Sequence, residues 1–152
     1  MSSVEEKLEK LGFKLPEISA PVAAYIPAKR AGNLIFTAGQ LPMVNGELFA
    51  TGLIQEDSDI DKAKVAARVC TLNALAAING VIGNLDKIKN IVRVVGYVAS
   101  SSEFTKQPAI VNGASELLLE IFGESGKHAR SAVGVAVLPL NASVEIELTV
   151  EI

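Results

Sequence analysis

The sequence has one cysteine and one histidine, Cys70 and His128, among its 152 residues. A single cysteine forms no internal disulfide and supplies too few thiolates for a cysteine-based metal site. A single histidine likewise provides no histidine cluster, and no spacing indicates a Ser-His-acid triad. We therefore predict a protein without bound metal or disulfide, which suits a reducing compartment.

Positive charge is also scarce, since 14 basic residues face 17 acidic ones and the net charge is −3. No basic run is available to neutralise a phosphate backbone, so we do not expect a nucleic-acid partner. No uninterrupted apolar run approaches the roughly 20 residues that cross a bilayer, which argues against a membrane protein. The N-terminus carries Glu5, Glu6 and Glu9 and has no apolar stretch typical of a secretory signal, so we expect a cytoplasmic protein.

No cofactor motif is recognisable in the chain. The glycines around residues 79–83 follow a helical pattern and are not followed by the Lys-Ser/Thr pair of a phosphate-binding loop. The length fits one domain, and we assign residues 1–152 to it. Residues 1–16 form an additional N-terminal segment, in which Ser2 or Ser3 is expected to cap a short helix with Glu5 or Glu6.

Two longer helices are predicted from apolar spacing. The first runs from Asp59 to Gly83 with an alanine-rich apolar stripe, and the second starts near Pro108 and ends at Gly123. His128 falls in the loop that follows, where a solvated side chain is the simplest expectation.

The remaining segments read as strands. Residues 25–28 and 34–39 flank a turn and predict a hairpin, and Asn45-Gly46 marks a second turn. Residues 91–99 predict a strand of β-branched and aromatic character. Residues 131–138 and 143–151 predict two strands joined as a hairpin, of which the second alternates apolar and mostly acidic positions.

This order predicts an α+β fold, with a mixed β-sheet and two main helices packed on one face. The other face of the sheet is then left for other chains to cover.

Three groups of residues, in this order along the chain, resemble the RidA/YjgF family. The first is Tyr25 followed by residues 33–42, NLIFTAGQLP. The second is residues 92–98 with Glu103-Phe104 and Val111-Asn112. The third joins Ala129-Arg130-Ser131, Leu138-Pro139 and residues 144–147, VEIE.

The resemblance implies a chorismate-mutase-like fold, a homotrimer and ligand sites in clefts between subunits. It also implies hydrolysis of 2-imino acids, or their enamine tautomers, to 2-keto acids and ammonia, the reaction of 2-iminobutanoate/2-iminopropanoate-type deaminases, without a cofactor. The family also carries the label endoribonuclease L-PSP.

Residue by residue, the resemblance matches Arg130 to the arginine that holds the substrate carboxylate and Glu145 to the glutamate associated with the catalytic water. Tyr25, Gly39 and Asn112 match positions near the pocket. Each also has a plain structural alternative: packing for Tyr25, a strand bend for Gly39, and local backbone orientation for Asn112.

Elementary chemistry supports the first two assignments. The guanidinium fork of Arg130 suits a planar carboxylate, although a surface ion pair with Glu151 or Asp86 is the alternative. Glu145 provides the proton acceptor that imine hydrolysis needs, although it is also one member of an acidic strand face.

If residues 138 and 143 pair in the predicted hairpin, Arg130 and Glu145 share a sheet face six residues apart, on the order of 20 Å. One small substrate does not span that distance, so two subunits would have to contribute the two side chains.

The sequence departs from the family at Ala132, where many relatives have a cysteine. The departure leaves a second function open: a non-catalytic trimeric protein that binds small carboxylate metabolites through the same arginine.

Overall fold

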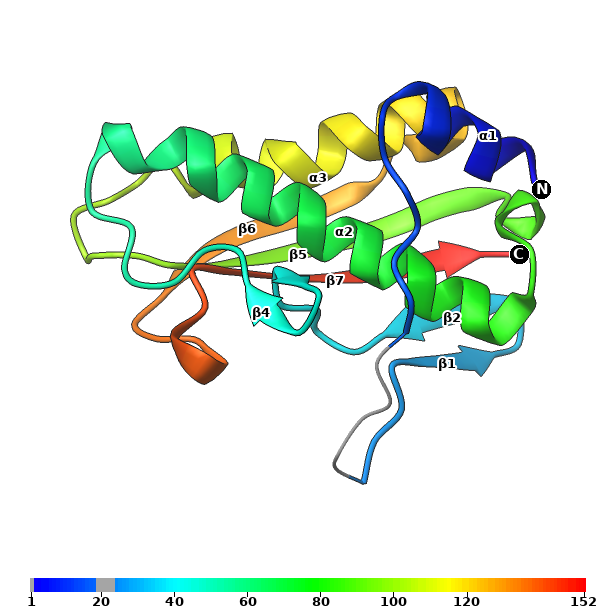
Figure 1. The fold of residues 1–152 in the computed structure, drawn as a ribbon, viewed down its shortest axis with the longest axis horizontal. Coiled ribbons are helices and arrows are strands. Elements are labelled where there is room, and N and C mark those ends of the chain that lie inside the picture. The colour runs from blue at the N-terminus through cyan, green and yellow to red at the C-terminus, as the bar shows by residue number, and fades with distance from the viewer. Residues whose placement is uncertain (1, 19–23) are drawn as a thin grey trace.

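The computed structural model of the protein describes residues 2–18 and 24–152 (Figure 1). A five-stranded mixed sheet runs through the molecule, and two long helices lie against one of its faces. The strand order is β1-β2-β7-β5-β6. These strands are β1 (Ala28–Ala31), β2 (Leu34–Thr37), β5 (Asn90–Ala99), β6 (Ala129–Val135) and β7 (Val144–Glu151). A separate small hairpin is formed by β3 (Met43–Val44) and β4 (Glu47–Leu48).

The helices are α1 (Ser3–Lys10), α2 (Ile60–Ile82) and α3 (Gln107–Phe122). The described residues also include four 3-10 turns: η1 (Asp57–Asp59), η2 (Leu85–Lys87), η3 (Gly123–Gly126) and η4 (Pro139–Asn141). All three helices were predicted within one or two residues, because each has a local start or stop signal. The α2 helix ends at Gly83, whose left-handed φ of 75° is cheap for glycine, and α3 has Pro108 in its first turn.

The N-terminal helix begins at a reciprocal capping box. The Ser2 hydroxyl accepts a hydrogen bond from the Glu5 backbone N–H at 3.2 Å, and the Glu5 carboxylate accepts one from the Ser2 N–H at 2.9 Å. Asp86 accepts two more bonds from the backbone N–H groups of Ser3 and Val4. These contacts tie the N-terminal segment to the turn that precedes β5.

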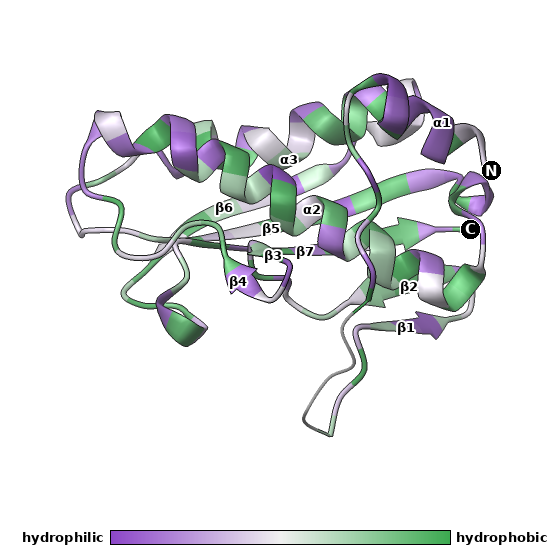
Figure 2. Cartoon of the chain, viewed as in Figure 1, coloured by the Kyte–Doolittle hydropathy of each residue, from purple (hydrophilic) through white to green (hydrophobic). Residues whose placement is uncertain are grey.

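The α2 and α3 helices bury their alanine-rich and branched residues against the sheet. Polar and apolar residues alternate along both helices in Figure 2, as expected for helices with one solvated face. The two helices approach so closely at Gly113 that a Cβ there would collide with the carbonyl oxygen of Lys64. Residues 57–82 are long and apolar enough to cross a membrane by length and composition, but 56% of the most apolar window is buried inside the protein. Here α2 is a core helix.

The first hairpin differs from the prediction. The β1 strand begins at Ala28 and includes Lys29 and Arg30, which the sequence placed in the turn. Only Gly32 and Asn33 form the turn itself. The second predicted turn is confirmed, because Asn45 and Gly46 adopt φ values of 51° and 82° between β3 and β4.

The predicted hairpin of the last two strands is wrong. The β5 strand lies between β6 and β7, pairing in parallel with β6 and antiparallel with β7. The connection through η4 therefore crosses over the end of β5, with Leu140 and Asn141 at positive φ. A strand, a helix and a strand in succession favour a parallel pair, because the helix supplies the long crossover that parallel strands need. That order of β5, α3 and β6 was visible in the sequence.

Strand alternation sorts side chains between the two faces of the sheet. On β7, Val144, Ile146, Leu148 and Val150 are buried beneath the helices. The intervening residues are half-buried on the opposite face, which no helix of the described chain covers. We call this the open face; it comprises Glu145, Glu147, Thr149 and Glu151 of β7 together with the residues aligned with them on neighbouring strands.

Candidate functional site

Arg130 lies on the edge strand β6 and points toward the helices. Its partner in register is Val94, which is fully buried on the helix side of β5. One terminal nitrogen, Nη1, donates to Asn112 Oδ1 at 2.7 Å and to Ser115 Oγ at 3.1 Å, both on α3. The structure thus joins Arg130 to Asn112, which the sequence had placed in the same site.

The arginine does not form the alternative ion pairs considered from the sequence. Glu151 accepts a hydrogen bond from Asn90, and Asp86 caps α1. No carboxylate of the described residues lies within 4.0 Å of Arg130. A guanidinium has five N–H hydrogens, and Asn112 and Ser115 engage only the two on Nη1. The edge formed by Nε and Nη2, which binds carboxylates by two parallel hydrogen bonds, has no partner among residues 2–18 and 24–152.

Ser115, one of the two residues that accept hydrogen bonds from Arg130, also contacts His128. Ser115 Oγ lies 2.8 Å from His128 Nε2, and His128 Nδ1 lies 2.6 Å from the carbonyl oxygen of Gly126. His128 lies in the loop before β6, as predicted, but its side chain is half-buried and hydrogen-bonded, so the expectation of a solvated side chain is wrong. Sequence reasoning also missed Ser115, although its spacing of three from Asn112 places both on one face of a helix.

Glu145 lies on the open face of β7, aligned with Tyr97 of β5. Its partial burial and the nearby charge of Glu147 raise the pKa of the Glu145 carboxyl above its ordinary value. Gly39 lies directly against this carboxylate: a Cβ at Gly39 would be 2.7 Å from Glu145 Oε1. The predicted proximity of Gly39 to the site is thus a contact with Glu145, and the absence of a side chain makes room for the carboxylate.

A tyrosine and a second glutamate adjoin Glu145. The Tyr97 hydroxyl donates to Glu147 Oε1 at 2.7 Å, and this bond is the largest of the effects that raise the pKa of Tyr97 to about 12. Tyr97 therefore stays protonated and holds Glu147 at neutral pH. The alternation of the last strand indicated Glu147, but only the pairing of β5 with β7 brings Tyr97 to it.

Arg130 and Glu145 lie on opposite faces of the sheet, which corrects the prediction that they share one. They also differ in strand, with β5 between them. Two strand spacings of about 4.8 Å and three residues of about 3.3 Å place their Cα atoms on the order of 14 Å apart. A small molecule held by one side chain does not reach the other through the sheet.

Tyr25 lies in the segment before β1 and is 58% exposed. The nearby carbonyl of Pro27 accepts a hydrogen bond from Ala38 N–H, so this segment runs beside the residues that lead to Gly39. Within the described chain the Tyr25 hydroxyl has no hydrogen-bond partner. The Tyr25 side chain is therefore not buried within one described subunit, and its place near the pocket stays a prediction.

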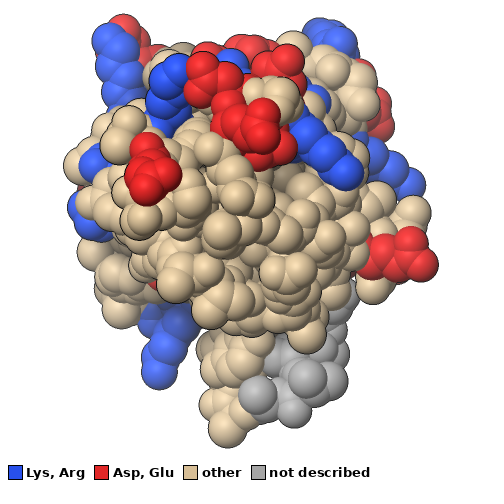
Figure 3. All heavy atoms as spheres, turned by 90° about the vertical axis from the view of Figure 1, so that its left-hand side faces the viewer, with Lys and Arg blue, Asp and Glu red and all other residues tan. Residues whose placement is uncertain are grey.

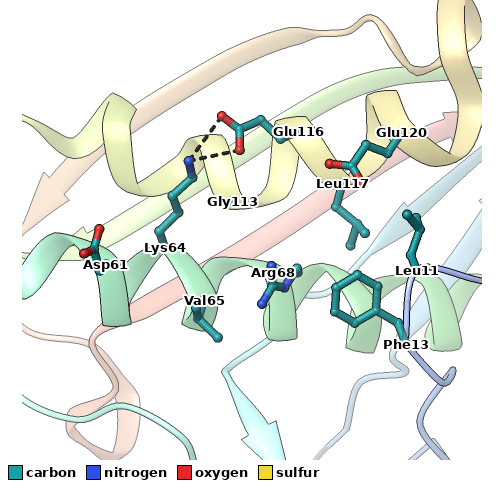
Figure 4. A pocket seen from close by; sticks show the side chains of 10 residues that line it. All are labelled: Leu11, Phe13, Asp61, Lys64, Val65, Arg68, Gly113, Glu116, Leu117 and Glu120. Atoms are coloured by element: carbon teal, nitrogen blue, oxygen red, sulfur yellow. Dashed lines mark hydrogen bonds and ion pairs between the residues drawn. The ribbon is translucent and has the colours of Figure 1, made fainter.

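A cavity of about 440 Å³ lies elsewhere, on the outer side of the helices. Figure 4 shows it between α2, α3 and the segment after α1, with Arg68 beside the ring of Phe13 and Lys64 paired with Glu116. None of the five predicted site residues lines it. Among the residues that the structure describes, no three His, Cys, Asp or Glu side chains gather in a way that could hold a metal ion.

Comparison with known proteins gives consistent matches along nearly the whole chain. The family described as YjgF/chorismate mutase-like, a description that also names endoribonuclease, matches residues 5–152. Protein TCP17 of Trypanosoma cruzi is 39% identical over 150 residues, which is 98% of this chain and 94% of that protein. A Dermatophagoides farinae protein named 2-iminobutanoate/2-iminopropanoate deaminase is 33% identical over 138 residues, covering 90% of this chain and 92% of its own. A crystal structure from Agrobacterium tumefaciens superimposes with a TM-score of 0.92 at 45% identity, covering 99% of this chain and 92% of the other.

Proposed function

Because the chain belongs to the YjgF/chorismate mutase-like family, we propose that it hydrolyses 2-imino acids and their enamine tautomers to 2-keto acids and ammonia. The observation that carries this proposal is the free Nε–Nη2 edge of Arg130, presented by Asn112 and Ser115. That edge suits the planar carboxylate of a 2-imino acid. The similarity to a named deaminase at 33% identity supports the same chemistry.

The reaction needs one water and no cofactor. The water oxygen attacks the imine carbon and forms a C–O bond, while the electrons of the C=N π bond move to nitrogen, which takes up a proton. The resulting carbinolamine then loses ammonia: the C–N bond breaks toward nitrogen as the oxygen forms the carbonyl of the keto acid. In the first step one proton leaves the water and one reaches the nitrogen. In the second step the carbinolamine hydroxyl loses its proton and the departing nitrogen gains another, so both hydrogens of the water are transferred in total.

Glu145 is the group that we assign to these proton transfers. A general acid–base catalyst works best when its pKa approaches the working pH, and the raised pKa of Glu145 moves it in that direction. The contact with Gly39 leaves the carboxylate a defined position on the open face. Tyr97 holds Glu147 nearby, so the charge that raises the pKa is itself anchored.

We further propose that the protein is a homotrimer in which each cleft takes Arg130 from one subunit and Glu145 from another. Their positions on opposite faces of one sheet favour this arrangement over a site within one chain. The open face also exposes apolar side chains, with Phe36 44% and Val133 43% accessible. One end of the molecule has a broad surface without charged side chains (Figure 3). The large apolar side chains of Leu53, Val137 and Leu140 are also exposed in the described chain. Such surfaces are typical of subunit contacts.

The direct test generates a 2-imino acid in place with an amino acid oxidase. Release of ammonia and keto acid should exceed the spontaneous rate in proportion to the protein added, and Arg130→Ala should abolish the excess. Native mass determination of the same sample should give three chains. A monodisperse monomer at micromolar concentration would contradict the shared cleft, and turnover equal to buffer alone would contradict the hydrolase.

Ala132 favours one alternative, a non-catalytic protein that binds small carboxylate metabolites. It stands on the helix side of β6, two residues after Arg130, and offers no thiol. Under this alternative, 2-keto acids raise the melting temperature of the protein through Arg130, yet imine turnover stays at the spontaneous rate.

A further inference from the structure

We infer that His128 is a positioning residue for Arg130, acting through the hydroxyl of Ser115. The inference rests on the proposed function insofar as Arg130 binds a substrate carboxylate. We call the chain of hydrogen bonds from Gly126 through His128 and Ser115 to Arg130 the relay. These bonds, with the one from Arg130 to Asn112, are four contacts that the structure contains.

The relay has one direction. The carbonyl oxygen of Gly126 only accepts, so His128 Nδ1, at 2.6 Å, carries a hydrogen. In the neutral imidazole Nε2 then has a lone pair and accepts from the Ser115 hydroxyl at 2.8 Å. With its own hydrogen committed to His128, Ser115 Oγ turns its lone pairs to Arg130 Nη1 at 3.1 Å.

This direction matters for the guanidinium because Nη1 needs two acceptors. Asn112 Oδ1 is one and Ser115 Oγ is the other, so both Nη1 hydrogens are engaged and the planar group is fixed in rotation. The free Nε–Nη2 edge consequently has a set orientation before any ligand arrives. A Ser115 hydroxyl without the histidine acceptor is free to rotate, and the arginine loses part of this support.

The supporting residues lie on α3 and just after η3, two elements that adjoin in sequence. Ser115 and Asn112 project from the same face of α3, and His128 follows η3, whose Gly126 is buried. A side chain at Gly126 would collide with the carbonyl oxygen of Leu118, so the turn that carries the acceptor carbonyl packs tightly against α3. His128 therefore bridges the end of η3 to the middle of α3, next to the arginine strand.

The first test reads the relay without any ligand. The chain has one histidine, so the ring ¹⁵N signals of a labelled sample belong to His128 without assignment. We expect the tautomer with hydrogen on Nδ1 at neutral pH, and a shift of the Nε2 signal in Ser115→Ala. A neutral histidine with its hydrogen on Nε2 would overturn the relay. Ring ¹⁵N signals that do not change in Ser115→Ala would overturn it as well.

The second test measures binding of 2-ketobutanoate to the intact protein by calorimetry, alongside imine turnover. Ser115→Ala and His128→Leu should each raise Kd about 3- to 10-fold, the effect of one lost neutral hydrogen bond. Because the relay acts in series, the double variant should lose no more than Ser115→Ala alone, whereas independent effects would multiply. Ser115→Thr keeps the hydroxyl and should restore most of the affinity. The matched control is Ser125→Ala, which removes a hydroxyl bonded to the Phe122 carbonyl in the same turn and should leave Kd unchanged.

The outcomes separate this inference from the proposed function. If Arg130→Ala leaves keto-acid binding intact, the arginine does not hold the carboxylate and the proposed function fails. If Arg130→Ala weakens binding while Ser115→Ala and His128→Leu do not, the carboxylate clamp stands and the positioning role of His128 is wrong.

Discussion

Gly39 and Glu145 are in contact, and the glycine is what allows the carboxylate to lie where it does. A Cβ at position 39 would be 2.7 Å from Oε1 and 2.8 Å from the carboxyl carbon of Glu145. The colliding atoms are the far end of a flexible side chain, so the protein can relieve the collision by moving the carboxylate. A substitution at Gly39 therefore acts on the position of Glu145 more than on the stability of the fold.

Gly39→Ala is accordingly expected to lower imine turnover by at least about tenfold through a displaced proton-transfer group, with a smaller effect on the melting temperature. The control is the same substitution in a Glu145→Gln background, where no further loss of turnover should occur. A full additional loss in that background would mean that Gly39 acts independently of Glu145.

Arg130→Lys keeps the positive charge of the side chain but removes the planar guanidinium, which can donate two parallel hydrogen bonds to a carboxylate. We expect 2-keto acid binding and imine turnover to fall together, by about 1.5–3 kcal/mol for a lost charge-assisted hydrogen bond. Calorimetry and initial rates on the same preparation measure the two effects. Unchanged affinity in Arg130→Lys would show that charge alone suffices and that the two-bond geometry is not used.

Glu145→Gln should change the pH dependence of stability. The pKa of Glu145 is raised in the folded protein, so this carboxyl stabilises the fold fully below its unfolded pKa and loses that contribution as the pH rises through the folded pKa. At neutral pH the charged Glu145 carboxylate therefore lowers the free energy of unfolding, and the uncharged glutamine removes this destabilisation. The melting temperature of Glu145→Gln should exceed that of the wild type at pH 7.5, and the difference should shrink as the pH falls to about 4.

The matched control for this measurement is Glu103→Gln, an exposed glutamate in the loop after β5. Its melting temperature should follow the wild type at both pH values. If the melting-temperature difference between Glu145→Gln and the wild type grew as the pH fell, the pKa of Glu145 would not be raised in the folded protein.

Arg130 and Glu145 should complement each other between chains. Arg130→Ala and Glu145→Gln proteins should each be inactive, the second with about a 10²–10⁴-fold loss of turnover. Mixed under conditions that exchange subunits, they should regain part of the activity, because some clefts then receive both intact side chains. Exchange verified by native mass with no return of activity would rule out a site shared between subunits.

The purified protein is expected not to cleave RNA, although the family description names endoribonuclease. The net charge of −3 supplies little of the electrostatic attraction that a phosphate backbone requires. Incubation with a labelled single-stranded RNA tests this. Cleavage that follows the protein through successive columns and disappears in Arg130→Ala would reverse the expectation.

Local signals in the sequence determined the helices and several turns. The Ser2–Glu5 capping box, Pro108 and Gly83 each act through contacts or dihedral angles within a few residues, so no tertiary information is needed to read them. The alternation along residues 144–151 likewise determined which side chains of that strand are buried, because successive residues of a strand face opposite sides. The candidate residues Arg130, Glu145, Gly39 and Asn112 also came from sequence, through family resemblance.

Tertiary structure decided which of these residues meet. The β5 strand lies between β6 and β7, and its register with each of them places Arg130 beneath the helices and Glu145 on the open face. Residues aligned on neighbouring strands point to the same face of a sheet, so the choice of strand partners and register decides the face. The packing of η3 against α3 brought His128 to Ser115, and strand pairing brought Tyr97 to Glu147. These contacts join residues 13 and 50 positions apart, and their geometry arises from packing of whole elements, which no local pattern encodes.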